Sequence, residues 1–170
     1  MAAKKSKKKN KQVKGDDAKG QSRTIAENRK ARHRFEILEQ LECGIQLVGS
    51  EVKSMREGQL SLDEAYVRIQ KKEIWLIGCD IGEYRQANIW NHAPKRPRKL
   101  LVHARQLQKL SVRAHEKGLT LVPLRVYFNS RGIVKVIVGV CRGKKQFDKR
   151  ESKKAQDVKR DIDRAMKARL

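Results

Sequence analysis

The chain has 170 residues, enough for one domain with extensions, and its formal net charge is +23, from 42 basic and 19 acidic residues. No stretch approaches the ~18 apolar residues of a membrane span, and no apolar run follows the N-terminal lysines, so we expect a cytoplasmic protein without a secretory signal. Positive charge gathered in blocks is typical of a nucleic-acid binder, with an anionic membrane as the competing polyanion.

The first 23 residues are mostly Lys, Gly, Gln and Asp, with nine basic and two acidic side chains. They carry too little apolar surface to offset the entropy lost on ordering, so we predict a disordered lysine-rich arm over 1–23. A single domain is predicted over 24–142.

The domain begins with a polar segment, residues 24–33. Its basic groups can neutralise phosphates, and its amide and imidazole groups can bond sugar or base edges. A solvated lead-in with a capped turn explains the segment equally well. The candidate RNA-binding residues here are Asn28, Arg29, Lys30, Arg32 and His33.

Apolar residues then predict two strands around Glu42, the first starting at Phe35 and the second covering residues 45–47. A short helix is predicted over 49–58, with Ser50 as its N-cap and Gly58 at its end. Lys53 lies on a basic face of this helix and is a further candidate for RNA contact, although a packing helix is the preferred interpretation.

Residues 66–70 and 74–77 predict a hairpin that turns at Lys71 and Lys72 without a glycine. A second hairpin joins residues 124–128 to residues 134–140 through a turn at 129–132. The strands and helices together predict a mainly β fold: a six-stranded antiparallel oligonucleotide-binding-like barrel with two to three flanking helices and a basic C-terminal tail.

Between the hairpins, residues 82–99 show no periodicity and predict a long loop. A helical stripe beginning at Leu100 follows and is stopped by Gly118. Arg98 and Lys99 are further candidates for RNA contact. They meet an apolar pair, Leu100 and Leu101, at a predicted loop-to-helix junction. Since both leucines cannot face the core of one helix, we expect one of them to be presented to a partner.

Signatures of catalysis and metal binding are missing from the sequence. There is no P-loop, GxSxG or HExxH motif, and the four histidines do not pair with Cys or carboxylates at ligand spacing. The three cysteines lie far apart and are interpreted as small core residues. We therefore expect a protein that is not an enzyme, with no cofactor and no metal.

The last segment, 143–170, is a basic tail with apolar residues at every fourth position from Val158, continuing at Ile162 and Met166. Such spacing forms one broad stripe on an α-helix. An isolated helix of this length is marginal, so we predict a tail that is disordered when free and helical when bound.

Five short motifs in this order resemble the SsrA-binding protein family of bacterial trans-translation, also called small protein B. The resemblance runs from about Thr24 to Lys167. It rests on Asn-Arg-Lys-Ala-Arg-His at 28–33, Gly-Ser-Glu-Val-Lys-Ser at 49–54, Arg-Lys-Leu-Leu at 98–101, Gly-Lys-Lys at 143–145 and Asp-Lys-Arg at 148–150.

The resemblance implies an adaptor that binds the tRNA-like domain of transfer-messenger RNA (tmRNA), and we expect the chain to be a monomer. The adaptor would bring the alanylated RNA, with elongation factor Tu, to stalled ribosomes. By the family pattern, Asn28, Glu42 and Leu101 would contact tmRNA. The tail would enter the empty messenger channel near the decoding centre. The tail residues implied in that contact are Gly143, Lys144, Lys145, Phe147, Asp148, Lys149 and Arg150.

Two positions depart from the family pattern. Phe147 stands where many members have histidine, so stacking on a base is kept and a protonatable group is lost. Ala165 stands where the tail helix has isoleucine, so Met166 and Ile162 would carry more of the contact. A general tRNA-binding or ribosome-associated barrel module is the alternative, and it predicts RNA binding that survives removal of the tail.

Overall fold

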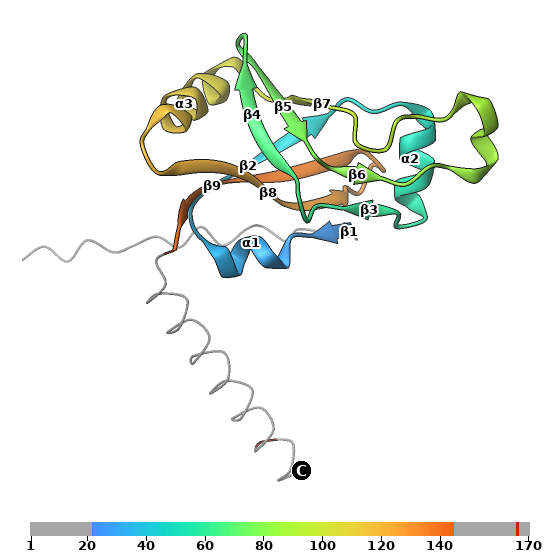
Figure 1. Cartoon of the computed structure of the whole chain (residues 1–170), viewed down its shortest axis with the longest axis horizontal. Helices are drawn as coiled ribbons and strands as arrows, with labels where there is room; N and C mark the ends of the chain where they lie inside the picture. The colour runs from blue at the N-terminus through green and yellow to red at the C-terminus, as the bar shows by residue number, and fades with distance from the viewer. Residues whose placement is uncertain (1–21, 145–165, 167–170) are drawn as a thin grey trace, which may run out of the picture.

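The computed structural model describes residues 22–144 and Met166, and it shows a ring of strands flanked by helices (Figure 1). Our predictions for the N-terminal arm, and those for the tail at Lys145, Phe147–Arg150, Val158 and Ile162, lie outside these residues. The elements, in chain order, are β1 (Arg23–Glu27), α1 (Arg29–Arg34), β2 (Phe35–Ile45), α2 (Gly49–Arg56), β3 (Leu60–Ser61), β4 (Tyr66–Gln70), β5 (Glu73–Ile77), β6 (Asp80–Ile81), the 3₁₀ segment η1 (Arg85–Trp90), β7 (Arg98–Leu101), α3 (Ala104–His115), β8 (Leu119–Phe128) and β9 (Val134–Gly143).

Six antiparallel strands form the ring, in the order β8, β4, β5, β7, β2 and β9, and β9 returns to β8. The joints of β9 with β2 and β8 run along nearly its whole length. The joint between β4 and β8 has a single registered pair, Val67 with Leu121. β1 extends the sheet beside the far end of β8. This arrangement confirms the predicted mainly β fold of six antiparallel strands with short helices.

The main core fills the ring with residues from every strand of it. Side chains of β9 point alternately to its two faces, and Val134, Val136, Val138 and Val140 are all buried in this core. Met55 of α2 and Leu110 of α3 close the core from outside the ring. A second, smaller cluster lies under α1, where Ala31 packs with Val122, Leu124 and Cys141. The three cysteines are buried and free, as expected for small core residues.

The prediction of two strands around Glu42 was wrong: β2 runs without a break from Phe35 to Ile45, and Leu47 lies outside any strand. β2 pairs with β9 along its length, with one irregularity between Ile37 and Glu39. Gly44 does not mark a turn. A Cβ atom there would lie 3.3 Å from the Leu101 Cβ, so the glycine allows the close approach of β7.

The helix predicted to start at Leu100 begins later, at Ala104, and the junction residues 98–101 form strand β7. The prediction was wrong because β7 completes the ring by pairing with both β5 and β2, a long-range constraint that periodicity does not report. Strand alternation buries Leu100 and leaves Leu101 51% exposed, so one leucine is presented to solvent as expected.

Both predicted hairpins are confirmed, β4–β5 and β8–β9. Lys71 and Lys72 both have positive φ, 50° and 61°, which matches the twist of a two-residue hairpin turn at some conformational cost. The short helix α2 is also confirmed, but its N-cap is Val48 rather than Ser50, and the Val48 N–H donates to the Glu51 carboxylate in the first turn. β1 and α1, which the lead-in interpretation of residues 24–33 left out, are additional elements.

Candidate nucleic-acid interface

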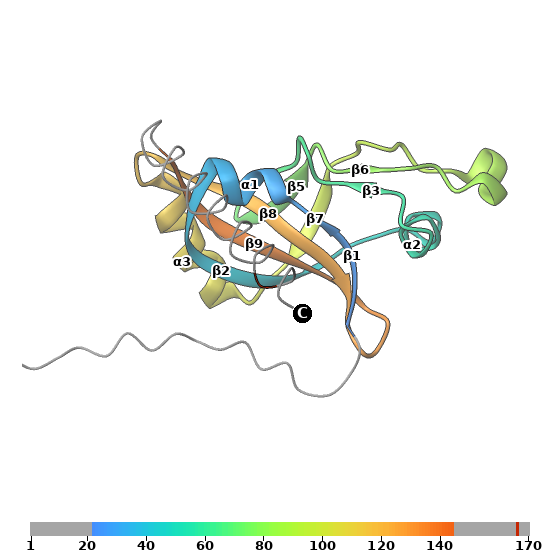
Figure 2. The ribbon, with the colours of Figure 1, turned by 90° about the horizontal axis from the view of Figure 1, so that it is seen from below.

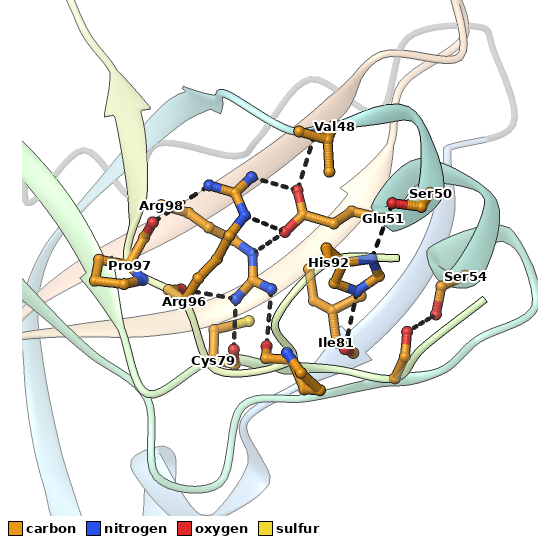
Figure 3. A network of polar contacts seen from close by, with 12 residues as sticks. Val48, Ser50, Glu51, Ser54, Cys79, Ile81, His92, Arg96, Pro97 and Arg98 are labelled. Carbon is orange, nitrogen blue, oxygen red and sulfur yellow. Dashed lines mark hydrogen bonds and ion pairs between the residues drawn. The ribbon is translucent and has the colours of Figure 1, made fainter. Parts of the chain in front are cut away.

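The buried base of the β6–β7 connection is held by a carboxylate between two guanidinium groups (Figure 3). Glu51 of α2 accepts from Arg98 at 2.8 Å and from Arg96 at 2.6 and 2.7 Å. Arg98 also donates to the carbonyl oxygens of Cys79 and Pro94. Burial by itself would raise the pKa of Glu51, but these hydrogen bonds outweigh it and the pKa lies below its ordinary value.

Arg98 is completely buried in this network, so its guanidinium group is not available to a ligand at the surface. Its place in the sequence, within a run of basic residues, gave no sign of this. Lys99, next along β7, points outward and pairs with Glu73 of β5. Lys53 of α2 lies over the Tyr84 ring, 5.4 Å from its centroid. Both lysines remain at the surface and stay candidates for phosphate contact.

Glu42 and Leu101, far apart in the sequence, line the same groove, which has a volume of about 440 Å³. Glu42 comes from β2 and Leu101 from the end of β7, which pair with one another at Gly44 and Ile45. The remaining lining residues are Gly44, Ile45, Val102, His103, Gln106, Ile133 and Lys135.

The Glu42 carboxylate is fixed from behind. It accepts a hydrogen bond from the Tyr127 hydroxyl at 2.6 Å, and it forms an ion pair with the Lys135 ammonium group at 3.2 Å. The Arg125 guanidinium group lies 4.9 Å from the Tyr127 ring centroid. The Tyr127 hydrogen bond, aided by Lys135 and opposed by burial, holds the pKa of Glu42 below its ordinary value. Glu42 is therefore an ionised acceptor at neutral pH, with its side chain still 51% exposed.

Asn28 lies apart from the groove residues and is only 5% exposed. Its side-chain oxygen accepts from the Ala31 N–H at 2.9 Å as the N-cap of α1, and its amide donates to the Leu62 carbonyl at 3.2 Å. Its own N–H donates to the Leu124 carbonyl. Asn28 thus fixes α1 on the sheet, and any effect of this residue on RNA contact would come through the position of α1.

α1 presents the other basic candidates of this segment to solvent. Arg29 and His33 are exposed, Lys30 pairs with Asp63 at 2.8 Å, and Arg32 pairs with Glu27 at 3.2 Å. The start of the tail is tied to this helix: the Lys144 N–H donates to the Arg34 carbonyl, and its ammonium group donates to the Arg32 carbonyl. Gly143 ends β9 and is exposed, as is Met166.

Residues 22–144 and Met166 contain no group of three His, Cys, Asp or Glu side chains that could hold a metal ion. Within the same part of the chain, no helix has both the length and the apolar character needed to cross a bilayer. The groove instead joins exposed leucine and isoleucine to ammonium, imidazole, amide and carboxylate groups. The fold and this groove define a small basic β-ring protein with the surface chemistry of an RNA binder.

Comparison with known proteins narrows this class. The family described as SmpB protein matches residues 25–168. An SsrA-binding protein from Rhodopirellula baltica is 57% identical over 143 residues, which cover 84% of this chain and 81% of that protein. One from Symbiobacterium thermophilum is 49% identical over 89% of this chain and 96% of its own length.

A solved structure described as "tmRNA-SmpB: a journey to the center of the bacterial ribosome" contains a chain that is 46% identical to this one. The match covers 71% of this chain and 85% of that chain, with a TM-score of 0.61. The chain belongs to the SmpB family.

Proposed function

We propose that this chain is an RNA-binding adaptor of trans-translation, which binds the tRNA-like domain of tmRNA and delivers it to stalled ribosomes. Similar proteins are named SsrA-binding protein, and a similar solved structure is described in terms of tmRNA, SmpB and the bacterial ribosome. The observation that carries the proposal is the single groove that brings Glu42 and Leu101 together with Lys135.

The groove chemistry suits a base edge rather than a phosphate alone. An ionised carboxylate repels phosphate, but it accepts hydrogen bonds from the N–H donors of a nucleobase. The exposed Leu101 offers apolar contact to a base or ribose. The Lys135 ammonium group attracts a neighbouring phosphate and so offsets its repulsion by Glu42. Glu42 would therefore select a donor edge, while α1 and the lysines of α2 and β7 position the RNA backbone.

In this proposal the adaptor catalyses no reaction and needs no cofactor. It acts as a monomer in the cytoplasm. Elongation factor Tu would join through the alanylated RNA. The tail, from Gly143 through Arg150, would enter the empty messenger channel, with Phe147 stacking on a base near the decoding centre. The stripe of Val158, Ile162 and Met166 would become helical there. The hydrogen bonds of Lys144 to α1 support a tail that starts beside the basic side chains of that helix.

The test is the affinity of Glu42→Gln and Leu101→Ser variants for the tRNA-like domain of tmRNA. Each change removes a contact to a base, so we expect binding weaker by about tenfold or more, as for the loss of one good base contact. Glu39→Gln and Leu38→Ser, at exposed positions of β2 that do not line the groove, are matched controls. Equal affinity of groove and control variants would contradict the proposal, as would equally tight binding to an unrelated RNA of the same length.

A second experiment separates the adaptor from a general RNA-binding barrel module. Ending the chain after Arg150 should leave tmRNA binding nearly unchanged and abolish tagging of stalled products, because only the ribosome contact is lost. If tagging continued without the tail, the general module would be the better description.

A further inference from the structure

The β6–β7 connection projects from the body of the protein beyond α2, at the end opposite α3 (Figures 1 and 2). It carries η1, whose residues 85–90 we call the tip segment. Ile89 and Trp90 of the tip segment are 81% and 83% exposed. Two adjacent large apolar side chains with so much exposure are typical of a contact surface.

The tip segment is presented by a braced base. Asn91 accepts from the Tyr84 N–H at 3.2 Å and donates to the Tyr84 carbonyl at 3.0 Å, which ties the two ends of the segment together. Behind them, His92 is buried between the Ser50 hydroxyl and the Ile81 carbonyl (Figure 3). The exposure of Trp90 therefore belongs to a positioned loop that is anchored on α2.

Within the tip segment, Asn88 adopts φ 47° and ψ −124°, a region that non-glycine residues rarely enter. This residue breaks the 3₁₀ turn immediately before Ile89 and Trp90. Backbone strain of this kind persists only where the surrounding structure imposes it. The kink and the two apolar side chains thus occur together at the end of the projection.

The chemistry of the tip segment fits RNA. It contains no carboxylate, its one charged side chain is Arg85, and Gln86 and Asn88 are exposed amides. An indole ring offers a stacking face to any base, a guanidinium group meets phosphate, and amides bond base edges. In a chain with a net charge of +23, this set favours a nucleic acid over a protein as the partner.

We propose that Trp90 stacks on an unpaired nucleobase of tmRNA, with Ile89 packing beside it and Arg85 on the adjoining phosphate. The inference rests on the proposed function and adds a second contact to the groove of Glu42 and Leu101. A tmRNA molecule held at both places would span α2 and β2, so the buried network around Glu51 would fix the spacing of the two contacts.

Fluorescence gives a direct test, because the chain has two tryptophans. Trp75→Phe in the full chain leaves Trp90 as the sole reporter. Titration with the tRNA-like domain of tmRNA should quench its emission in step with binding measured independently on the labelled RNA. Unchanged Trp90 emission at saturating RNA would overturn the inference.

Variants at Trp90 separate stacking from apolar contact in general. Trp90→Leu should weaken binding of the tRNA-like domain by about tenfold, while Trp90→Phe, which keeps an aromatic face, should retain most of the affinity. Val112→Ala, at an exposed apolar position on α3, is the matched control and should bind as the parent does. Thermal unfolding of each variant should match the parent, since the side chain is exposed.

The outcomes distinguish this inference from the function on which it rests. If the parent binds tmRNA and Trp90→Leu binds it equally well, only the inference fails. If Trp90→Leu keeps RNA affinity but loses association with ribosomes, the tip segment docks elsewhere, and the inference again fails. If the parent itself does not bind tmRNA specifically, the proposed function fails first.

Discussion

Glu51 and Glu42 both lie among basic side chains, yet their environments give them opposite roles. Glu51 is fully buried, and its carboxylate oxygens accept hydrogen bonds from Arg96, Arg98 and the Val48 N–H. Glu42 is half exposed and keeps free surface in a groove, although Tyr127 and Lys135 hold it from behind. The same pairing of charges thus builds the scaffold where water is excluded and a candidate recognition site where water remains.

The largest expected effect is on the buried side of this comparison. Glu51→Gln leaves the buried Arg98 guanidinium without its carboxylate, so the free energy of unfolding should fall by about 3–5 kcal/mol. Because the pKa of Glu51 is lowered in the folded state, its contribution is present at neutral pH and is lost as the pH falls through that pKa. Denaturant titration checks the value, and Glu39→Gln should change it by less than ~0.5 kcal/mol. A Glu51→Gln variant as stable as that control would remove the distinction between the two carboxylates.

Tyr127 tests the support behind Glu42. Burial, together with the hydrogen bond to Glu42, raises the pKa of Tyr127 to about 12. The hydroxyl therefore stabilises the fold below the ordinary tyrosine pKa, and this contribution, at most about 2–3 kcal/mol, is lost as the pH rises through about 12.

Unfolding measured at pH 9 and pH 11 should show a steeper loss for the parent than for Tyr127→Phe, because lysine titration is common to both proteins. Parallel pH dependences would mean that the hydroxyl is not held by Glu42 as the structure shows.

The smallest effect is expected at an exposed pair on the α1 side. Lys30 and Asp63 are 2.8 Å apart and both more than half exposed, so their coupling in a double-mutant cycle should not exceed about 1 kcal/mol. If Lys30 meets a phosphate, Lys30→Ala should instead weaken binding to all RNAs alike and reduce the salt slope by about one. A Lys30–Asp63 coupling energy of about 3–5 kcal/mol, the size expected at Glu51, would show that solvent exposure does not distinguish a weak surface ion pair from a stabilising buried one.

The sequence predicted those features that depend on local pattern. Alternation in β9 and the turn at Lys71 and Lys72 placed both hairpins, and Gly58 with φ +81° ends α2 as expected. The features it missed depend on distant partners. β7 covers the end of the predicted loop and the start of the predicted helix, but it forms a strand because β5 and β2 flank it. Arg98 looks like a surface cation because its partner Glu51 is 47 residues away.

The candidate site was predicted in part. The family resemblance named Glu42 and Leu101, and the ring places both in one groove. Lys135, His103 and Gln106 were missed, since each follows from register and from the start of α3 rather than from a motif. Trp90 carried no periodic signal at all; an unpaired aromatic residue inside a long basic loop was the only sign available.

The uneven joints of the ring have a consequence for how the protein opens. β4 and β8 share one registered strand pair, Val67 with Leu121, whereas β9 is paired on both edges along its length. A ring of this kind is expected to open first where its pairing is shortest, between β4 and β8. Amide hydrogens of β4 should exchange with solvent through small local openings, whereas those of β9 should exchange only on global unfolding. Faster exchange at β4 than at β9 would show that the ring opens at this edge before the whole domain unfolds.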